Sequence, residues 1–237
     1  MKLEISAKRS QESIRAYALR IIHKNLLKMN LVPGMALSEQ EIANELHISR
    51  TPVREAFIRL AHENILVILP QRGTYVEKIA LEQVAESMFL RTTMESEVMK
   101  LACCSFPTRN IDQLEACLEL QRISLKQKDY PRFFEQDGIF HGSIFAACGK
   151  HRIWQMIEQA SLNYNRLRMM NLANDGENEM PMLFKHHQNI LTAIKQADIE
   201  AGRSLINEHV GKVFSNLDDL KLQYPSYFKG GTEDTLI

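Results

Sequence analysis

Residues 37–76 read LSEQEIANELHISRTPVREAFIRLAHENILVILPQRGTYV, and this stretch decides the fold of the first part of the chain. The pattern Ser38-x-x-Glu41 is a capping box, which predicts a short helix that ends near Leu46. The turn at residues 47–49 separates this helix from a second one. Apolar residues at positions i, i+3, i+4 and i+7 predict the second helix and give it one apolar stripe: Val53, Ala56, Phe57 and Leu60.

The segments on either side of these two helices complete the order of elements. Before them, apolar residues recur at helical spacing from residue 10 to about 29, and Pro33-Gly34 interrupts the pattern. After them, a β-rich run at 65–69, a turn at 70–73 and a second run at 74–76 predict a hairpin. Helix, helix, turn, helix and hairpin is the order of a winged helix-turn-helix.

Beyond residue 80 the pattern changes to long amphipathic helices with almost no strand character. We therefore expect a mainly α protein, with a winged helix-turn-helix at 8–78, an all-α helical bundle at 81–222 and a flexible tail at 223–237. The predicted helices of the bundle span residues 81–105, 109–128, 130–148, 150–173, 181–196 and 198–222.

The composition is that of an ordinary globular protein rather than a disordered one. Of 237 residues, 45% are apolar and 24% are charged, which is enough to bury a core. No apolar run approaches the roughly 18 residues of a membrane span, and the N-terminus mixes charges where a secretory signal would be apolar. The four cysteines lack CxxC spacing, which suits reduced thiols. We therefore expect a cytoplasmic protein without a membrane partner.

Charge is unevenly distributed along the chain. Residues 1–80 carry 12 Lys and Arg against 8 Asp and Glu, whereas the remainder carries 17 against 21. The net charge of zero therefore combines +4 in the first third with −4 in the rest. A basic first third suggests that this part meets a polyanion while the rest has another task.

The helix that begins near residue 50 carries the chemistry of DNA recognition. Arg50 and Arg54 lie one turn apart on its exposed face, so both can enter one major groove, where arginine pairs with guanine O6 and N7. Thr51 is a short polar residue suited to a phosphate contact. Two arginines on an isolated helix more often form a solvated charged face. In a helix-turn-helix followed by the hairpin tip Arg72-Gly73, we favour double-stranded DNA as the partner.

Through its SRTPVREA core and its PQRGTYV wing, the stretch resembles the DNA-binding domain of GntR-family bacterial transcription regulators. Many members of that family carry an arginine where this chain has Gln40, so this contact and the operator sequence are expected to differ here. The helical remainder is similar to the FCD effector domain of the FadR subfamily, in its shorter VanR-type variant. The resemblance implies DNA contacts from five residues of the recognition helix and wing: Arg50, Thr51, Arg54, Arg72 and Gly73.

The helical part carries a second group of chemically active residues. Asp137 and His141 lie at i and i+4 on one predicted helix, so their side chains project side by side, and later helices supply His187 and His209. Three imidazoles and a carboxylate suit zinc, nickel, iron or manganese. A histidine on an apolar helix face is more often a hydrogen-bonded core residue. These four positions match the metal ligands of metal-binding FCD domains, so the resemblance implies a divalent metal ion, with zinc as the first choice.

Arginines near the expected cavity are candidates for an effector site. Arg91 matches the arginine that opens the FCD domain and often faces the ligand cavity, although it could instead pair with Glu95 at i+4. Arg166 is the second candidate. Arg166 and Arg168, on the same predicted helix, could each line the cavity or lie at the surface. The four ligands would leave a divalent ion with a charge of about +1, which favours an anionic oxygen ligand. We therefore expect a small organic acid or sugar acid as the effector.

These observations favour a ligand-responsive DNA-binding transcription regulator. One winged helix contacts too few base pairs to be selective in a genome, so we expect a homodimer on a pseudo-palindromic operator. One alternative is a pure metal sensor, in which the ion itself is the effector. A metal-dependent enzyme is a further alternative, but the sequence offers no convincing general base, nucleophile motif or phosphate loop. We therefore expect no enzymatic activity.

Overall fold

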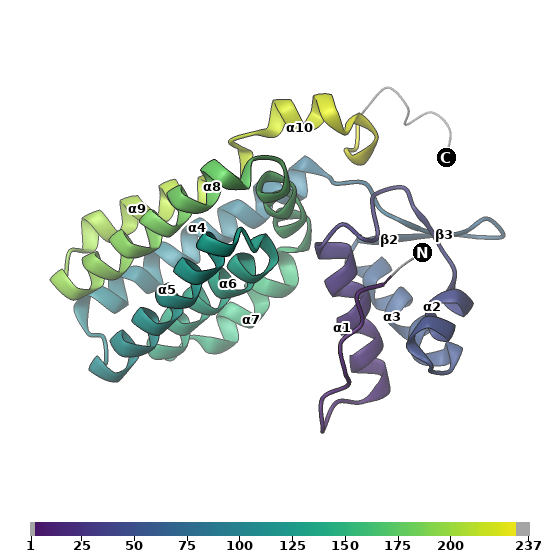
Figure 1. The fold of residues 1–237 in the computed structure, drawn as a ribbon, viewed down its shortest axis with the longest axis horizontal. Helices are drawn as coiled ribbons and strands as arrows, with labels where there is room; N and C mark the ends of the chain where they lie inside the picture. The colour runs from purple at the N-terminus through teal and green to yellow at the C-terminus, as the bar shows by residue number, and fades with distance from the viewer. Residues whose placement is uncertain (1–2, 231–237) are drawn as a thin grey trace. The chain divides into compact units, whose positions relative to one another are not determined.

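A computed structural model describes residues 3–230, and the chain in it forms two units (Figure 1). The first unit contains the residues up to Leu81 together with the segment from Lys221 onward. The second unit contains Glu82–Leu220. The chain therefore passes from one unit to the other twice.

The first unit is a winged helix-turn-helix, as the sequence predicts. The capping box is present, because the side chain of Ser38 accepts a hydrogen bond from the amide of Glu41 at 3.3 Å. The four residues of the predicted apolar stripe, Val53, Ala56, Phe57 and Leu60, are buried, and so are Ile21 and Ile42 in the two helices before them. The elements are α1 (Ile14–Leu27), β1 (Ala36–Leu37), α2 (Glu39–Leu46), α3 (Arg50–His62), β2 (Leu66–Leu69) and β3 (Gly73–Val76).

The sheet contains one strand more than the sequence predicts. Its order is β1-β3-β2 with antiparallel pairs, and Ala36 of β1 lies opposite Tyr75 of β3. A strand of two residues has no alternating pattern that a sequence could reveal. β1 forms because β3 offers it an unpaired edge, which is a contact between distant parts of the chain.

The second unit is an all-α bundle, which confirms the predicted fold class (Figure 1). α5 packs against α6 and α8, and α8 also packs against α6 and α9. Within residues 3–230, no helix is both long enough and apolar enough to cross a membrane. The helices are α4 (Leu81–Cys104), α5 (Thr108–Gln127), α6 (Tyr130–Ala147), α7 (His151–Ala160), α8 (Leu162–Gln196), α9 (Ile199–Gly211) and η1 (Lys212–Phe214). After them, α10 (Leu217–Gln223) leads from the second unit into the first, and η2 (Pro225–Tyr227) belongs to the first unit.

The helix predicted at 150–173 is divided in two. A break at Ser161 separates α7 from α8. The hydroxyl of Ser87 in α4 donates a hydrogen bond to the carbonyl of Ala160 at 2.9 Å, which satisfies one of the backbone acceptors that the end of α7 leaves free. Because this partner comes from another helix, no turn residue marks the break in the sequence.

The helix predicted to start near Pro181 begins earlier, since α8 runs through this proline and bends instead at Asp175. The backbone of Asp175 has φ −138° and ψ 38°, which is not helical. A Cβ at Gly176 would lie 2.3 Å from Cε1 of Tyr130, so only glycine allows this close approach beside the bend. Packing against α6, rather than the proline, therefore fixes the position of the bend.

Residues before the expected domain start at residue 8 contact α1. Leu3 is buried. The amide of Glu4 donates to Oδ1 of Asn25 in α1 at 2.7 Å, and Nδ2 of Asn25 donates to the carbonyl of Glu4 at 3.1 Å. The buried Asn25 therefore ties the N-terminal residues to α1, as a side chain with both donor and acceptor can do.

The described part of the tail that we expected at 223–237 contacts the chain just before α4. Phe228 is 3% exposed. The amide of Ile79 donates to the carbonyl of Tyr227 at 2.8 Å, and the amide of Lys229 donates to the carbonyl of Ile79 at 3.0 Å. A buried aromatic ring and two backbone hydrogen bonds therefore fix the segment to the chain just before α4, and the residues after 230 lie outside the described part.

Candidate functional site

The recognition helix α3 presents its predicted DNA-binding residues to solvent. Arg50, Thr51 and Arg54 are all exposed. Val53 and Phe57 are fully buried and hold the opposite face of the helix against the core. The first turn of a helix also leaves backbone N–H groups free, which adds positive potential for a phosphate. The surface therefore combines two cations with a helix N-terminus.

The wing presents the other two predicted residues, Arg72 and Gly73, and both are exposed. Gly73 has φ +113°, a conformation that other residues rarely adopt, so the start of β3 requires glycine. The hydroxyl of Tyr75 donates to the carbonyl of Arg72 at 2.9 Å and holds the tip of the hairpin. All five predicted DNA-binding residues are thus at the surface of the first unit.

Sequence spacing does not reveal that Glu39 belongs to this surface. Oε2 of Glu39 lies 2.6 Å from Nε of Arg50, whose side chain is 65% exposed. An exposed ion pair contributes only about 0–1 kcal/mol, so Arg50 can exchange this partner for a phosphate or a base. Gln40, at the position where the family resemblance suggests an arginine, donates to Oδ1 of Asn44 at 2.9 Å.

The four predicted metal ligands come together inside the helical bundle. α6 carries Asp137 and His141, α8 carries His187, and α9 carries His209. All four residues are buried. Each offers one ligand atom, and these atoms lie within 4.8 Å of one another. Three helices thus bring the four side chains into one small volume.

The three imidazole Nε2 atoms face one another. Nε2 of His209 lies 3.1 Å from Nε2 of His141 and 3.3 Å from Nε2 of His187. Oδ1 of Asp137 lies 3.3 Å from Nε2 of His187 and 3.6 Å from Nε2 of His209. The side chains therefore direct their ligand atoms, and not their carbon edges, toward a common centre.

Three of the four ligands contact a polar side chain outside the cluster, and for the two histidines this contact is at Nδ1, the ring nitrogen away from the centre. Such contacts orient a ligand and fix which nitrogen of an imidazole carries the proton. The pairs are Arg168 Nη2 with Asp137 Oδ1, His141 Nδ1 with Glu95 Oε2, and His187 Nδ1 with Gln121 Oε1, each at 2.7 Å.

These contacts determine where two of the imidazole protons lie. The carboxylate of Glu95 can only accept, so Nδ1 of His141 donates to it and Nε2 keeps a lone pair. Gln121 donates through Nε2 to the carbonyl of Gln136 at 3.3 Å, which turns its amide oxygen toward His187. His187 therefore also donates through Nδ1. Two of the three imidazoles thus direct lone pairs into the centre.

The charge state of the centre follows from its burial and its neighbours. Burial by itself raises the pKa of Asp137, but the charge of the Arg168 guanidinium holds this pKa well below its usual range. Burial lowers the pKa of His187 to about 4 and brings the pKa of His209 well below its ordinary value. At neutral pH the centre therefore contains a carboxylate beside the uncharged imidazoles of His187 and His209.

The residues fit a divalent metal ion. Oδ2 of Asp137 and Nδ1 of His209 have no hydrogen-bond partner among residues 3–230. Lone pairs that face one another in a buried site repel, and a cation between them removes this repulsion. The chain therefore has a buried cluster of histidines and one aspartate that could hold a metal ion.

Arg91 adopts the alternative that its spacing allows and pairs with Glu95. Nε of Arg91 lies 2.6 Å from Oε1 of Glu95, and both side chains are buried. The guanidinium carbon also lies 4.9 Å from the ring centroid of Tyr164 and 5.6 Å from that of Trp154. Nη2 of Arg91 has no hydrogen-bond partner in the described part of the chain. Because Glu95 also contacts His141, Arg91 is linked to the cluster through one residue.

Of the two candidate arginines in α8, Arg168 contacts the cluster through Asp137. Arg166 is fully buried and donates through Nη1 to Oδ1 of Asn163 at 2.9 Å. Sequence reasoning considered Arg168 but did not connect it with Asp137. It also missed Gln121, because α5 carries no other member of the cluster and no local pattern marks this glutamine.

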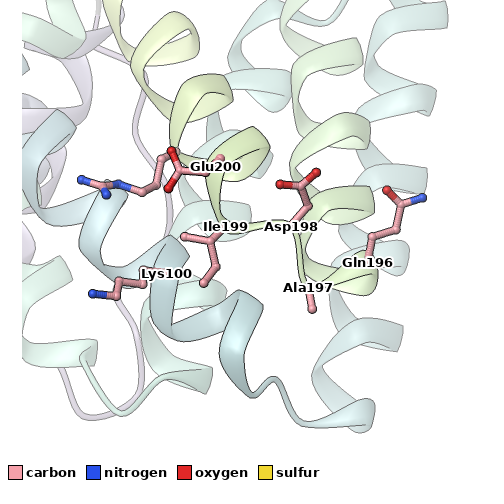
Figure 2. A pocket seen from close by; sticks show the side chains of 7 residues that line it. Lys100, Gln196, Ala197, Asp198, Ile199 and Glu200 are labelled. Carbon is pink, nitrogen blue, oxygen red and sulfur yellow. The ribbon is translucent and has the colours of Figure 1, made fainter.

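A pocket at the surface of the second unit is separate from the cluster. Figure 2 shows it where the turn after α8 leads into α9, with Lys100 of α4 on one side and Asp198 and Glu200 near the start of α9. Its lining residues carry both charges and include none of the four candidate ligands. The pocket therefore favours no particular class of ligand.

Comparison with known proteins identifies both units. Residues 17–76 match the family described as bacterial regulatory proteins, gntR family, and residues 86–212 match the FCD domain. The HTH-type transcriptional repressor RspR of Escherichia coli K12 is 31% identical over 209 residues, which cover 88% of this chain and 91% of that protein. The gluconate operon transcriptional repressor of Bacillus subtilis 168 is 27% identical over 212 residues, which cover 86% of this chain and 87% of that protein.

Solved structures share the fold. Escherichia coli McbR/YncC matches with a TM-score of 0.76 at 23% identity, over 90% of this chain and 100% of that chain. A putative GntR regulator from Rhodococcus sp. RHA1 matches with a TM-score of 0.73 at 18% identity, over 88% and 99%. These families and relatives are transcriptional regulators rather than enzymes, which confirms that expectation. The chain belongs to the GntR family of bacterial transcription regulators, in the FadR-like subfamily that carries a C-terminal FCD domain.

Proposed function

We propose that this DNA-binding transcriptional regulator changes its affinity for operator DNA when a small organic acid binds at a metal centre in its FCD domain. The observation that carries the proposal is the accumulation of acceptor atoms in a buried site. Two imidazole lone pairs and a carboxylate face one another where water is excluded, and a cation stabilises such an arrangement. The proposed ligands are Asp137, His141, His187 and His209.

The donor atoms favour zinc as the metal ion, with nickel, iron or manganese as alternatives. When bound, a divalent ion supplies positive charge that attracts an anionic oxygen ligand. The chain's own residues orient the donors, since Glu95 and Gln121 each hold one imidazole and Arg168 holds the carboxylate.

The surroundings of Arg91 support an acid as the effector. Its Nη2 has no hydrogen-bond partner among residues 3–230, and a guanidinium binds a carboxylate through paired hydrogen bonds. Arg166 stays our second candidate cation, and Arg168, which contacts Asp137, is a third. One relative is described as a repressor of a gluconate operon, and gluconate is a sugar acid whose carboxylate neighbours a hydroxyl. We therefore infer a small organic acid or sugar acid of this kind.

We further propose that the chain reads DNA as a homodimer on a pseudo-palindromic operator. One winged helix contacts few base pairs, and a two-fold dimer doubles the number that is read. Sedimentation of the free protein and of its operator complex tests this, and a monomer's mass under both conditions contradicts it. The proposed contacts are the five exposed residues Arg50, Thr51, Arg54, Arg72 and Gly73.

Calorimetry with a panel of sugar acids and dicarboxylates tests the effector site. The wild type, a chelator-stripped sample and His187→Ala are titrated with each acid, and operator affinity is measured with and without the acids that bind. We expect binding to the wild type alone and its return to the stripped sample when zinc is added. The expected change in operator affinity is roughly 5- to 150-fold. An acid that bound all three samples equally would contradict the role of the metal.

A pure metal sensor is the second candidate, because four protein donors already complete a tetrahedral zinc shell. In this case zinc alone changes operator affinity and no acid adds to the change. The same titrations therefore separate the two functions.

A further inference from the structure

His209 differs from the other three proposed ligands because it has no second polar partner. Asp137, His141 and His187 each contact a further polar side chain at 2.7 Å. Nδ1 of His209 has no hydrogen-bond partner among residues 3–230, although only 2% of the side chain is exposed. This nitrogen is therefore buried and does not lie at the surface of the unit.

This difference decides the protonation pattern when no metal is bound. His141 and His187 donate through Nδ1, so their Nε2 atoms face the centre as acceptors. Nε2 of His209 lies 3.1 Å and 3.3 Å from these two acceptors and 3.6 Å from Oδ1 of Asp137. If Nε2 of His209 carries a proton, it attracts the three surrounding acceptor atoms, whereas a lone pair on Nε2 would repel them.

We propose that His209 is the exchangeable ligand of the metal centre, the last to bind the ion and the first to leave it. The inference rests on the metal centre proposed above. To act as a ligand, Nε2 of His209 must lose its proton to solvent, and a proton is taken up from solvent at Nδ1, so the imidazole stays neutral. No side chain of the described residues accepts a hydrogen bond from that new Nδ1–H. His141 and His187 need no change of tautomer.

An exchangeable ligand explains how an acid could enter a centre that already has four protein donors. An acid that binds through two oxygens needs more than one position on the ion. Turning the ring of His209 away breaks no hydrogen bond at Nδ1, whereas turning His187 away breaks its hydrogen bond with Gln121 and turning His141 away removes its 2.7 Å contact with the carboxylate of Glu95. The position of His209 is therefore the one that such an acid can take.

Zinc titration of the full chain by calorimetry tests this order. We compare the wild type with His209→Ala, His187→Ala and His141→Ala, each checked for folding without metal by circular dichroism. Loss of affinity should be about tenfold smaller for His209→Ala than for the other two, the size of effect that a hydrogen-bonded partner typically has on a metal ligand. Equal losses would overturn the inference and leave the metal centre intact. A wild type that bound no zinc would overturn both.

The tautomers can be read directly in the wild type, which needs no variant to fold. Long-range proton–nitrogen correlation spectra of the imidazoles are recorded with and without zinc. We expect His141 and His187 to carry the proton on Nδ1 in both states and His209 to change from Nε2–H to Nδ1–H. The same tautomer of His209 in both states would overturn the inference.

Gln121 allows a matched control. Gln121→Leu removes the partner of His187, so the affinity losses of His187→Ala and His209→Ala should become similar in this background. Gln121→Glu keeps an acceptor oxygen and should preserve the difference. An undiminished difference in Gln121→Leu would show that anchoring is not its cause.

Discussion

Two Arg–Glu pairs with identical spacing show how differently the two units use charge. In α3, Nε of Arg59 lies 3.1 Å from Oε1 of Glu63, and the side chains are 45% and 30% exposed. In α4, Nε of Arg91 lies 2.6 Å from Oε1 of Glu95, and the side chains are 3% and 2% exposed. One pattern, Arg followed by Glu at i+4, thus produces a solvated pair in the DNA-binding unit and a buried pair in the FCD unit.

The difference in exposure between the two pairs indicates which charges can interact with a binding partner. Exposed cations such as Arg50 and Arg54 remain hydrated and can exchange water for phosphate or bases. Buried charges must be compensated as the chain folds, because an isolated charge is unstable in a low dielectric. The charges of Arg50 and Arg54 are therefore available to a macromolecular partner, whereas the buried charges of Arg91 and Glu95 belong to a fixed arrangement.

The largest expected effect comes from removing one partner of each pair. Glu95→Ala leaves Arg91 charged and buried, so the free energy of unfolding should fall by about 3–5 kcal/mol. The matched variant Glu63→Ala breaks the exposed pair and should lower it by about 0–1 kcal/mol. Urea denaturation in the presence of a chelator measures both, and equal losses would contradict the comparison.

Acid should destabilise the metal-free protein through its buried histidines. Burial lowers the pKa of His187 from 6.5 to about 4, so in this window the unfolded chain binds a proton that the native chain does not. Stability is therefore lost as the pH falls from 6.5 toward 4, by up to about 3 kcal/mol for this one group. His209, whose pKa is also lowered by burial, acts in the same direction.

Denaturation at several pH values above 4.5 measures how steeply the free energy of unfolding falls with pH. The pH stays above 4.5 because carboxylates with lowered pKa values lose their stabilising contribution only below that pH. His187→Ala should reduce the slope, whereas the same change at the exposed His151 should leave it unchanged. An unchanged slope in His187→Ala would contradict the prediction.

The same contrast between buried and exposed residues applies to the C-terminal segment. Phe228→Ala should lower the free energy of unfolding by about 1.5–3 kcal/mol, the contribution of a buried aromatic side chain, and should speed amide exchange at Ile79. Leu222→Ala is the control, because Leu222 is 82% exposed and its loss should have an effect of less than about 0.5 kcal/mol. Unaltered exchange at Ile79 in Phe228→Ala would show that the ring does not hold the segment.

The smallest effect is expected from the exposed arginines of α3, whose loss should change the affinity for DNA and not the stability of the fold. Arg54→Ala should weaken binding to an operator duplex selected by the wild type by about 1–3 kcal/mol and relax its base preference. Arg59→Ala removes an exposed arginine of the same helix that already pairs with Glu63, and should change binding less. Fluorescence anisotropy measures both, and equal losses would contradict a specific role for Arg54.

The sequence by itself determined the elements that local interactions encode. The capping box at Ser38, the apolar stripe of α3 and the helical spacing beyond residue 80 all act within a few residues, so each can be read without knowledge of the fold. The Asp137 and His141 pair is local in the same way, since one helical turn separates the two residues. Their combination with His187 and His209 depended on the family resemblance.

Only the tertiary structure decided the features that join distant segments. The strand β1, the bend at Asp175 and the buried position of Phe228 each depend on a partner far away in the chain. Likewise, Gln121 gained its role only when α5 packed against α8 and brought its amide oxygen to His187. Helical spacing indicates which residues share a face of a helix, but not which other helix packs against that face. Burial and hydrogen bonding depend on this packing.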